Sequence, residues 1–269
     1  MKQQLAADLS TFMNYDYTVL ESGDSAAAAV IRFVNPTSRV LEIGAGSGAI
    51  SRHLVKSKKC NLTALEINPS SIAKLKKICA SVHSLDLNDK AWPLALNDEG
   101  KFDHVIAADV LEHVYDPWTV LKGMKSLLND KGSIILSLPH ASHSAVLAAL
   151  YLGEFEFREW GLLDKTHIRF FGYKNVEALY ANAGLKIVRC HLVYYKPEES
   201  ELAHAWKTLP ENVREVLGQR PYGNVFQIVT EAVLIERDVQ SISIESCLPN
   251  VPASKQPGKF MRWLKKSKR

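Results

Sequence analysis

The chain has 269 residues, 46% of them hydrophobic, which is enough for one sizeable α/β domain with additions. Its four cysteines lie far apart without a Cys-x-x-Cys pair, which argues against a zinc site or a disulfide framework and for a reducing, cytoplasmic location. No apolar run approaches the roughly 20 residues of a membrane span, and the N-terminus lacks the pattern of an export signal.

The net charge of +4 is unevenly distributed along the chain. Residues 253–269 contain seven Lys and Arg residues and no acid, so the rest carries 26 basic and 29 acidic residues. A mildly acidic body argues against a nucleic-acid substrate, which calls for a basic face. The basic tail also contains Phe260, Met261, Trp263 and Leu264, a composition typical of peripheral membrane contact and also of a solubilising tail.

A strand followed by three glycines at alternate positions lies near the N-terminus. Residues 22–34 predict a capped helix, and Val40–Ile43 predict a strand. Gly44, Gly46 and Gly48 then predict a tight turn into a helix. Such a turn lets a ligand approach the main chain without a Cβ in the way, so we predict a nucleotide-like ligand.

The glycine pattern alone fits two classes of ligand, because Gly44, Gly46 and Ala49 also match the dinucleotide fingerprint. Glu42 separates the classes. A carboxylate at the end of the first strand would repel a pyrophosphate, whereas the ammonium and sulfonium groups of S-adenosylmethionine are cationic. The pattern Glu42-x-Gly44-x-Gly46-x-Gly48 resembles motif I of the class I S-adenosylmethionine-dependent methyltransferases.

Strands and helices alternate along the rest of the chain. We predict strands at 62–66, 82–85, 102–109, 132–139, 185–192 and 223–236, and helices after residue 69 and at 117–129, 144–152, 173–183 and 198–218. With the resemblance, this order implies a Rossmann-like α/β fold: a seven-stranded, mostly parallel sheet with helices on both faces and one antiparallel strand.

The predicted domain organisation has three parts. We expect an N-terminal helical segment at 1–37 and a methyltransferase domain at 38–236, with substrate-side insertions at about 140–172 and 196–222. Residues 237–269 form a basic tail in which we expect no fold of its own.

Acids at the strand ends are the remaining cofactor candidates. Glu66 ends the second strand about 20 residues past the glycines, where a carboxylate can accept both hydroxyls of a ribose. Asp86-Leu87 resembles the pair that holds the adenine, with Asp89 as the competing acid, and Asp109 ends the fourth strand, at the edge where ligands bind. The predicted cofactor-binding residues are Glu42, Gly44, Gly46, Gly48, Glu66, Asp86, Leu87 and Asp109.

Within the expected insertion, residues 153–171 resemble a segment of a bacterial methyltransferase subgroup often encoded with glycosyltransferases and cell-surface glycan enzymes. The subgroup's usual Pro-Asn is Pro139-His140 here. Phe155, Phe157, Trp160, Phe170 and Phe171 suit a lid or a sugar-stacking wall, and equally a packed insertion. We therefore predict O-methylation of a small-molecule or glycan-type acceptor, which includes lipid-linked ones.

Two histidines are the predicted catalytic residues, since a base is needed where the nucleophile carries a proton with a high pKa. His113 follows the fourth strand and can equally hold a helix start, whereas His167 lies in the insertion and is the stronger candidate. With Asp109 and Glu112 they resemble the magnesium site of some methyltransferases of ubiquinone synthesis and small-RNA end modification. Those relatives have Glu in the place of Asp109, so we do not favour magnesium and predict no metal ligands.

Three other functions remain open at this point. They are RNA methylation, an NAD-dependent oxidoreductase, and a protein that binds the cofactor without catalysis. The sequence does not predict the oligomeric state.

Overall fold

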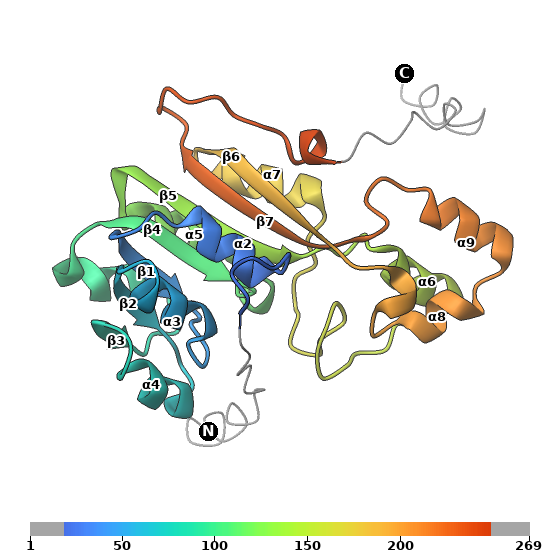
Figure 1. The fold of residues 1–269 in the computed structure, drawn as a ribbon, viewed down its shortest axis with the longest axis horizontal. Coiled ribbons are helices and arrows are strands. Elements are labelled where there is room, and N and C mark those ends of the chain that lie inside the picture. Colours follow the sequence, from blue (N-terminus) through green and yellow to red (C-terminus); the bar gives the residue numbers. More distant parts are fainter. Residues whose placement is uncertain (1–18, 249–269) are drawn as a thin grey trace.

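The computed structural model describes residues 19–248 and contains a seven-stranded sheet in the order β3-β2-β1-β4-β5-β7-β6 (Figure 1). Within these residues β7 runs antiparallel to β5 and β6, and the other strand pairs are parallel. The predicted fold class is confirmed. The strands are β1 (Arg39–Ile43), β2 (Asn61–Leu65), β3 (Ser81–His83), β4 (Phe102–Ala108), β5 (Leu128–Pro139), β6 (Leu185–Tyr194) and β7 (Val225–Leu234).

Helices cover both faces of the sheet. The helices α2 and α3 pack on one face, and α5 and α7 pack on the other (Figure 1). The α-helices are α2 (Ala26–Phe33), α3 (Ala49–Lys56), α4 (Pro69–Leu75), α5 (Pro117–Ser126), α6 (Ser144–Leu152), α7 (Tyr173–Asn182), α8 (Ala203–Thr208) and α9 (Glu211–Gly218). Short 3-10 helices are η2 (Trp92–Glu99), η3 (Leu111–His113), η4 (Pro197–Glu199) and η5 (Ile244–Cys247).

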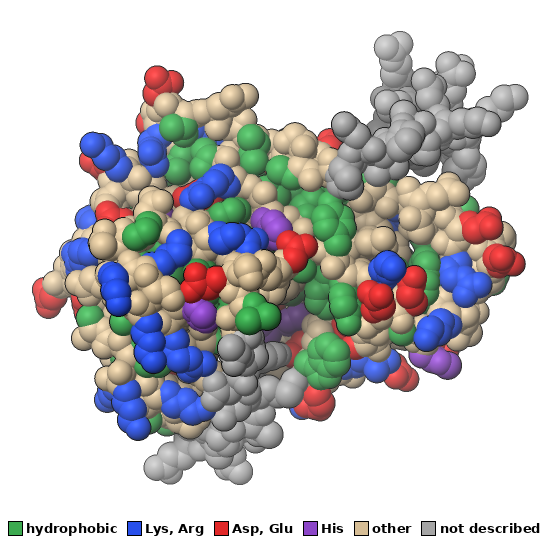
Figure 2. All heavy atoms as spheres, in the orientation of Figure 1, with side chains coloured by type: hydrophobic (Ala, Val, Ile, Leu, Met, Phe, Trp, Pro, Cys, Tyr) green, Lys and Arg blue, Asp and Glu red, His purple; other side chains and the backbone are tan. Residues whose placement is uncertain are grey.

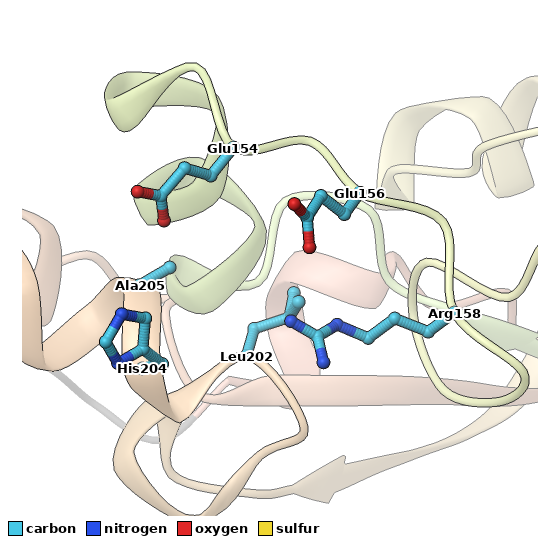
Figure 3. A pocket seen from close by; sticks show the side chains of 6 residues that line it. All are labelled: Glu154, Glu156, Arg158, Leu202, His204 and Ala205. Carbon is cyan, nitrogen blue, oxygen red and sulfur yellow. The ribbon is translucent and has the colours of Figure 1, made fainter.

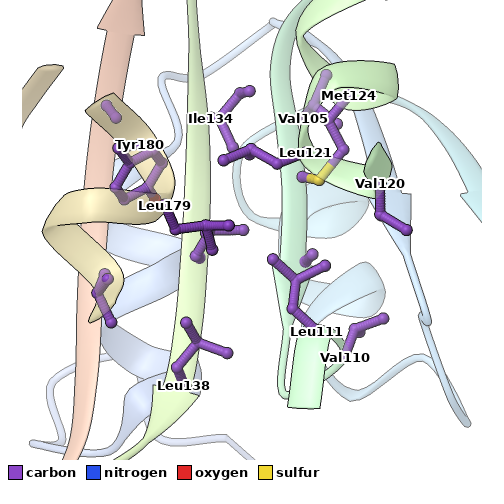
Figure 4. Packing of buried hydrophobic residues seen from close by; sticks show 14 of the residues in the cluster. Val105, Val110, Leu111, Val120, Leu121, Met124, Ile134, Leu138, Leu179 and Tyr180 are labelled. Carbon is purple, nitrogen blue, oxygen red and sulfur yellow. The ribbon is translucent and has the colours of Figure 1, made fainter. Parts of the chain in front are cut away.

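The larger core lies between the sheet and the pair α5 and α7. Val105 and Ile134 of the central strands contact Leu121 of α5, and Leu179 and Tyr180 of α7 complete the layer (Figure 4). All five side chains are almost fully buried. Burying one such side chain contributes about 1.5–3 kcal/mol, so this layer fixes the central strands and, with them, the carboxyl ends that carry polar residues.

The two predicted insertions pack against each other. Helix α6 and residues Leu162 and Leu163 of the first insertion share a small core with Leu202 and Trp206 of the second. This helical lobe lies beside the sheet at the right of Figure 1. Pro210 separates α8 from α9, so the second insertion holds two helices where one was expected.

Two strand boundaries differ from the prediction. β3 ends at His83, so Asp86 lies three residues past the strand and does not leave it directly. β5 begins at Leu128, and the ladder with β4 passes from the pair Phe102–Leu128 to the pair His104–Ser133. The start expected at residue 132 therefore lies inside the strand, where the ladder is irregular.

No helix within residues 19–248 is long and apolar enough to cross a membrane. The basic segment 253–269 and the first 18 residues of the N-terminal segment lie outside the described residues.

Candidate active site

The turn after β1 is shaped by close contact with the end of β4. Gly44 has a φ of +65°, and its N–H donates to the Leu65 carbonyl over 2.9 Å. A Cβ at this position would lie 2.5 Å from a methyl carbon of Val110. Gly44 is therefore required by packing, and this packing places the glycine turn directly beside the residues that follow β4.

The next glycine of the turn faces open space. Gly46 has a φ of +54°, and an added Cβ would meet no protein atom within 4 Å. Gly48 follows with a φ of +86° and is the residue before α3. A left-handed backbone with nothing over it at the start of a helix is a cradle into which a ligand can reach the main chain.

Glu66 closes the other side of this cradle. Its Oε2 accepts from Gly46 N over 2.7 Å, and its Oε1 accepts from Ile67 N and Asn68 N, each over 2.8 Å. A carboxylate has about four acceptor positions, and these three bonds leave about one of them available. The sequence predicts that this carboxylate accepts from two ribose hydroxyls. Ile67, an apolar side chain that is 51% exposed, lies right beside this carboxylate and was not predicted from the sequence.

The residues predicted to hold the adenine lie on a loop whose aspartates accept hydrogen bonds from the same loop. Asp86 is exposed, and its Oδ1 accepts from the main-chain and side-chain nitrogens of Asn88. Asp89 makes a similar bond with the Ala91 N–H, while Leu87 packs against the main core. Both aspartates are occupied in turns, so the choice between them stays a prediction.

Glu42 is buried under the turn. Its Oε2 accepts from the Ser51 hydroxyl of α3 over 2.6 Å. Burial raises the pKa of Glu42 to about 7, and the nearby Glu66 carboxylate adds to this, although the bond from Ser51 opposes it. Near neutral pH the carboxyl is therefore only partly charged, which weakens the electrostatic argument that the sequence suggested.

Asp109 has a strained backbone at the carboxyl end of β4. Its φ is +54°, in the left-handed region that a non-glycine residue seldom occupies. Its Oδ1 accepts from the Ser137 hydroxyl and from the Gln227 amide, each over 2.9 Å. Neighbouring β5 and β7 thus hold this carboxylate in place.

Three predicted or weighed residues meet just past Asp109. The Nε2 atoms of His113 and His167 each lie 4.0 Å from Oε1 of Glu112, and the two ring centroids are 4.8 Å apart. Glu112 is 1% exposed, and neither of its carboxylate oxygens has a hydrogen-bond partner. Their ligand atoms all lie within 4.8 Å of one another, so the three could hold a metal ion.

Burial and neighbouring charge act on this cluster. Burial, with the Asp109 carboxylate as a second cause, holds the pKa of Glu112 well above its usual range. Burial also lowers the pKa of His167, and the nearby His113 adds to that shift. His167 is therefore held neutral, with a lone pair available for a proton or a metal ion.

His140 does not join the cluster. It is fully buried, and its Nδ1 lies 3.1 Å from the Val225 carbonyl. Its ring centroid lies 5.7 Å from that of Tyr222. The histidine in place of the expected asparagine thus faces the junction between β7 and the second insertion.

The first insertion is anchored to the end of β4. The Glu112 carbonyl accepts from Ile168 N over 2.9 Å and from Arg169 N over 3.0 Å. The five predicted aromatic residues of this segment differ in burial: Phe171 is buried in the main core, Phe155 is half-buried against the helical lobe, and Phe157, Trp160 and Phe170 are exposed. The segment therefore combines the two predicted alternatives, a sugar-stacking wall of exposed aromatic rings and a packed insertion.

One cavity of the described residues lies away from this site. A space of about 250 Å³ lies in the helical lobe, where Glu154 and Glu156 face His204 and Arg158 over the floor formed by Leu202 and Ala205 (Figure 3). It touches neither the glycine turn nor Glu112. We place the site at the carboxyl ends of β1 and β4, because the chain reverses its direction of winding between these strands and ligands bind at such points.

A family model described as a methyltransferase domain matches residues 20–189, which is more than half of the chain. The chain belongs to the methyltransferase-domain family. S-adenosylmethionine is the cofactor of this methyltransferase domain, and the open Gly46 turn and the Glu66 carboxylate fit it. The dinucleotide interpretation is set aside.

Known proteins resemble the methyltransferase over part or most of its length. A ubiquinone biosynthesis O-methyltransferase of Xanthomonas campestris is 32% identical over 127 residues, which cover 45% of this chain and 53% of the relative. The chain thus spans about half the length of the curated relatives it matches first.

Two solved structures share the fold. The 1,6-didemethyltoxoflavin-N1-methyltransferase of Burkholderia thailandensis, solved with its substrate and S-adenosylhomocysteine, has a TM-score of 0.52 and 16% identity, covering 86% of this chain and 87% of that one. The [4+2]-cyclase SpnF also has a TM-score of 0.52, with 12% identity, covering 86% and 91%. The fold therefore supports more than one chemistry, so the reaction has to be inferred from the residues of the site.

The raised pKa of Glu42 predicts a pH-dependent stability. Between the usual pKa of 4.5 and about 7, the folded state keeps a proton that the unfolded state has lost, so stability falls as pH rises. Relative to Glu42→Gln, the wild type should lose up to about 3 kcal/mol of unfolding free energy from pH 4.5 to pH 8.

Urea unfolding of both proteins at several pH values measures this difference. Glu159→Gln, at an exposed position, is the matched control and should follow the wild type. A gap between wild type and Glu42→Gln that does not change with pH contradicts the assignment.

Proposed function

We propose that this methyltransferase transfers a methyl group to a hydroxyl oxygen of a small-molecule or glycan-type acceptor. The observation that carries the proposal is the Glu112–His113–His167 cluster beside the glycine turn. Val110 contacts Gly44, and Glu112 follows two residues later, so the cluster and the cofactor cradle share one edge of the sheet. A hydroxyl placed between them would face a methyl donor on one side and proton acceptors on the other.

The chemistry demands little of the protein besides position and proton removal. The acceptor oxygen displaces the cofactor's sulfur in line, and the sulfur leaves without needing a proton. Holding the two reactants in this geometry supplies most of the rate. The hydroxyl proton passes to Nε2 of His167 or His113, since an alcohol is a poor nucleophile until its proton is lost. N-methylation of an uncharged amine would not need such a base.

The same three side chains fit a divalent metal ion. Two buried carboxylate oxygens without a hydrogen-bond partner and two imidazole nitrogens are donor atoms suited to a cation. Magnesium prefers oxygen ligands, whereas imidazole suits zinc, copper, iron or nickel. We therefore include a transition-metal site in the proposal, which the sequence analysis did not favour. An ion bound to these nitrogens would take the place of the histidine base, because it occupies their lone pairs, and would act by polarising the acceptor hydroxyl and lowering its pKa.

The rim of the site supports an acceptor with an apolar part. Tyr115 and Trp118 follow the cluster and are 71% and 44% exposed, and Ile168 and Phe170 on the anchored insertion are also exposed. The guanidinium of Arg169 lies over the Trp118 ring, 5.7 Å from its centroid. Apolar groups around one cation suit a glycan linked to a lipid through an anionic group, at the cytoplasmic face of a membrane. The basic tail would add a peripheral contact with anionic lipid.

RNA methylation is the second candidate, favoured by one observation. Residues 44–85 contain seven Lys and Arg residues and a single acid, Glu66. Figure 2 shows Lys and Arg side chains crowded over the part of the surface that α3 and α4 form in Figure 1. The overall acidity of the body therefore hides a basic face, although the exposed Lys59 and Lys77 follow the helix ends, where cations also stabilise the helix dipole.

The acceptor class is tested with labelled cofactor. The full chain is incubated with S-adenosylmethionine carrying a tritiated methyl group and with nucleotide sugars, lipid-linked glycans, catechols or total RNA. We expect label in a hydroxyl compound as an alkali-stable ether. His167→Asn should lower kcat about 100-fold, within the range lost with a general base, while S-adenosylhomocysteine binds as before. Label in RNA alone, or on nitrogen, contradicts the proposal.

Metal binding is tested separately by calorimetry with zinc chloride alone. One ion per chain should bind after dialysis against EDTA, and Glu112→Gln should weaken its affinity at least tenfold, because the only carboxylate of the cluster is lost. Glu154→Gln in the helical lobe is the matched control. Equal affinity in the wild type and in Glu112→Gln removes the metal from the proposal.

A further inference from the structure

The segment that carries His167 also holds the ring of His113. The hydroxyl of Thr166 lies 3.0 Å from Nδ1 of His113, and the carbonyl oxygen of Thr166 lies 3.1 Å from the same nitrogen. Thr166 therefore contacts one nitrogen of the ring, while the other nitrogen is the one closest to Glu112.

Asp164 holds Thr166 in turn. Its Oδ1 accepts from Thr166 N over 2.8 Å and from the Thr166 hydroxyl over 2.6 Å. Asp164 is 5% exposed, so these bonds are shielded from water. A chain of hydrogen bonds thus runs from Asp164 through Thr166 to His113, across two segments that are some 50 residues apart in sequence.

The direction of these bonds determines where the proton of His113 lies. The Thr166 hydroxyl has one hydrogen, which it donates to Asp164, so its oxygen can only accept from His113. A carbonyl oxygen can also only accept. Nδ1 must therefore carry the proton, and in a neutral imidazole Nε2 then has a free lone pair.

We propose that Asp164 and Thr166 are positioning residues that fix the proton of His113 on Nδ1 and direct its Nε2 lone pair toward Glu112 and His167. The Leu162 carbonyl, 3.3 Å from Nδ1 of His167, sets the same tautomer there. The consequence for catalysis rests on the proposed function, whereas the tautomer does not. Outer hydrogen bonds of this kind fix ring orientation at sites where a histidine binds a metal or takes a proton.

The test compares two variants of one side chain. Thr166→Val keeps the shape and loses the hydroxyl, whereas Thr166→Ser keeps the hydroxyl. Thr208→Val, in which another threonine hydroxyl is removed from the exposed surface of α8, is the control. Asp164→Asn is a second variant in case Thr166→Val fails to fold.

Nitrogen NMR of the metal-free full chain, labelled in its histidines, reports the tautomer directly. We expect a protonated Nδ1 and a bare Nε2 for His113 in the wild type, in Thr166→Ser and in Thr208→Val. In Thr166→Val the main-chain carbonyl is the acceptor left at Nδ1, so the form protonated on Nδ1 should stay the major one, with a measurable fraction protonated on Nε2. Asp164→Asn, which weakens the hold on the Thr166 hydroxyl, should show a similar partial shift. In these two variants kcat and zinc affinity should fall about tenfold, while the affinity for S-adenosylhomocysteine stays constant.

A proton on Nε2 in the wild type, or a tautomer that Thr166→Val leaves unchanged, overturns the proposal. If the spectra agree with it but the wild type methylates no hydroxyl and binds no metal, the proposed function fails and the positioning role stands.

Discussion

The carbonyl oxygen of Glu112 joins the two halves of the site. It accepts the N–H groups of Ile168 and Arg169, and this pair of bonds brings the first insertion to the end of β4. Together with the bonds between Thr166 and His113, they place Nε2 of His167 4.0 Å from the Glu112 carboxylate. The proposed cofactor side is built into the sheet, whereas the proposed acceptor side depends on how one segment docks, which is the usual division between rigid scaffold and functional loop.

Buried charge is handled differently on the two sides. Glu42 and Glu66 both find donors, from Ser51 and from main-chain N–H groups. Glu112 finds none, although it is buried at least as deeply as Glu42. A carboxylate left in that state costs free energy, so its presence points to a partner that the protein itself does not supply: a proton, a substrate hydroxyl or a cation.

Much of the cofactor side could be predicted from sequence, because its signals are local. Gly44, Gly46 and Glu66 lie within one strand-turn-helix-strand unit, and their spacing alone predicts the turn. The residues of the cluster could be named from the sequence but not their arrangement, since bringing His113 and His167 together depends on contacts between distant segments. The bonds from Thr166 and Asp164 could not be predicted at all, because they depend on a loop conformation that no periodicity encodes. The net charge of the chain also conceals how the charges are distributed, since the basic face over α3 and α4 disappears in a sum over all residues.

The central claim is that the open turn at Gly46 is the cofactor cradle. Calorimetric titration of S-adenosylhomocysteine into the wild type, Gly46→Ala and Gly153→Ala tests it most directly, with NADH as the competing ligand. Both glycines have a positive φ and no protein atom near an added Cβ, so both variants pay the same backbone penalty of about 1–2 kcal/mol. The account predicts micromolar binding to the wild type and to Gly153→Ala, and at least a tenfold loss in Gly46→Ala. Equal binding to all three proteins, or binding of NADH alone, would contradict it.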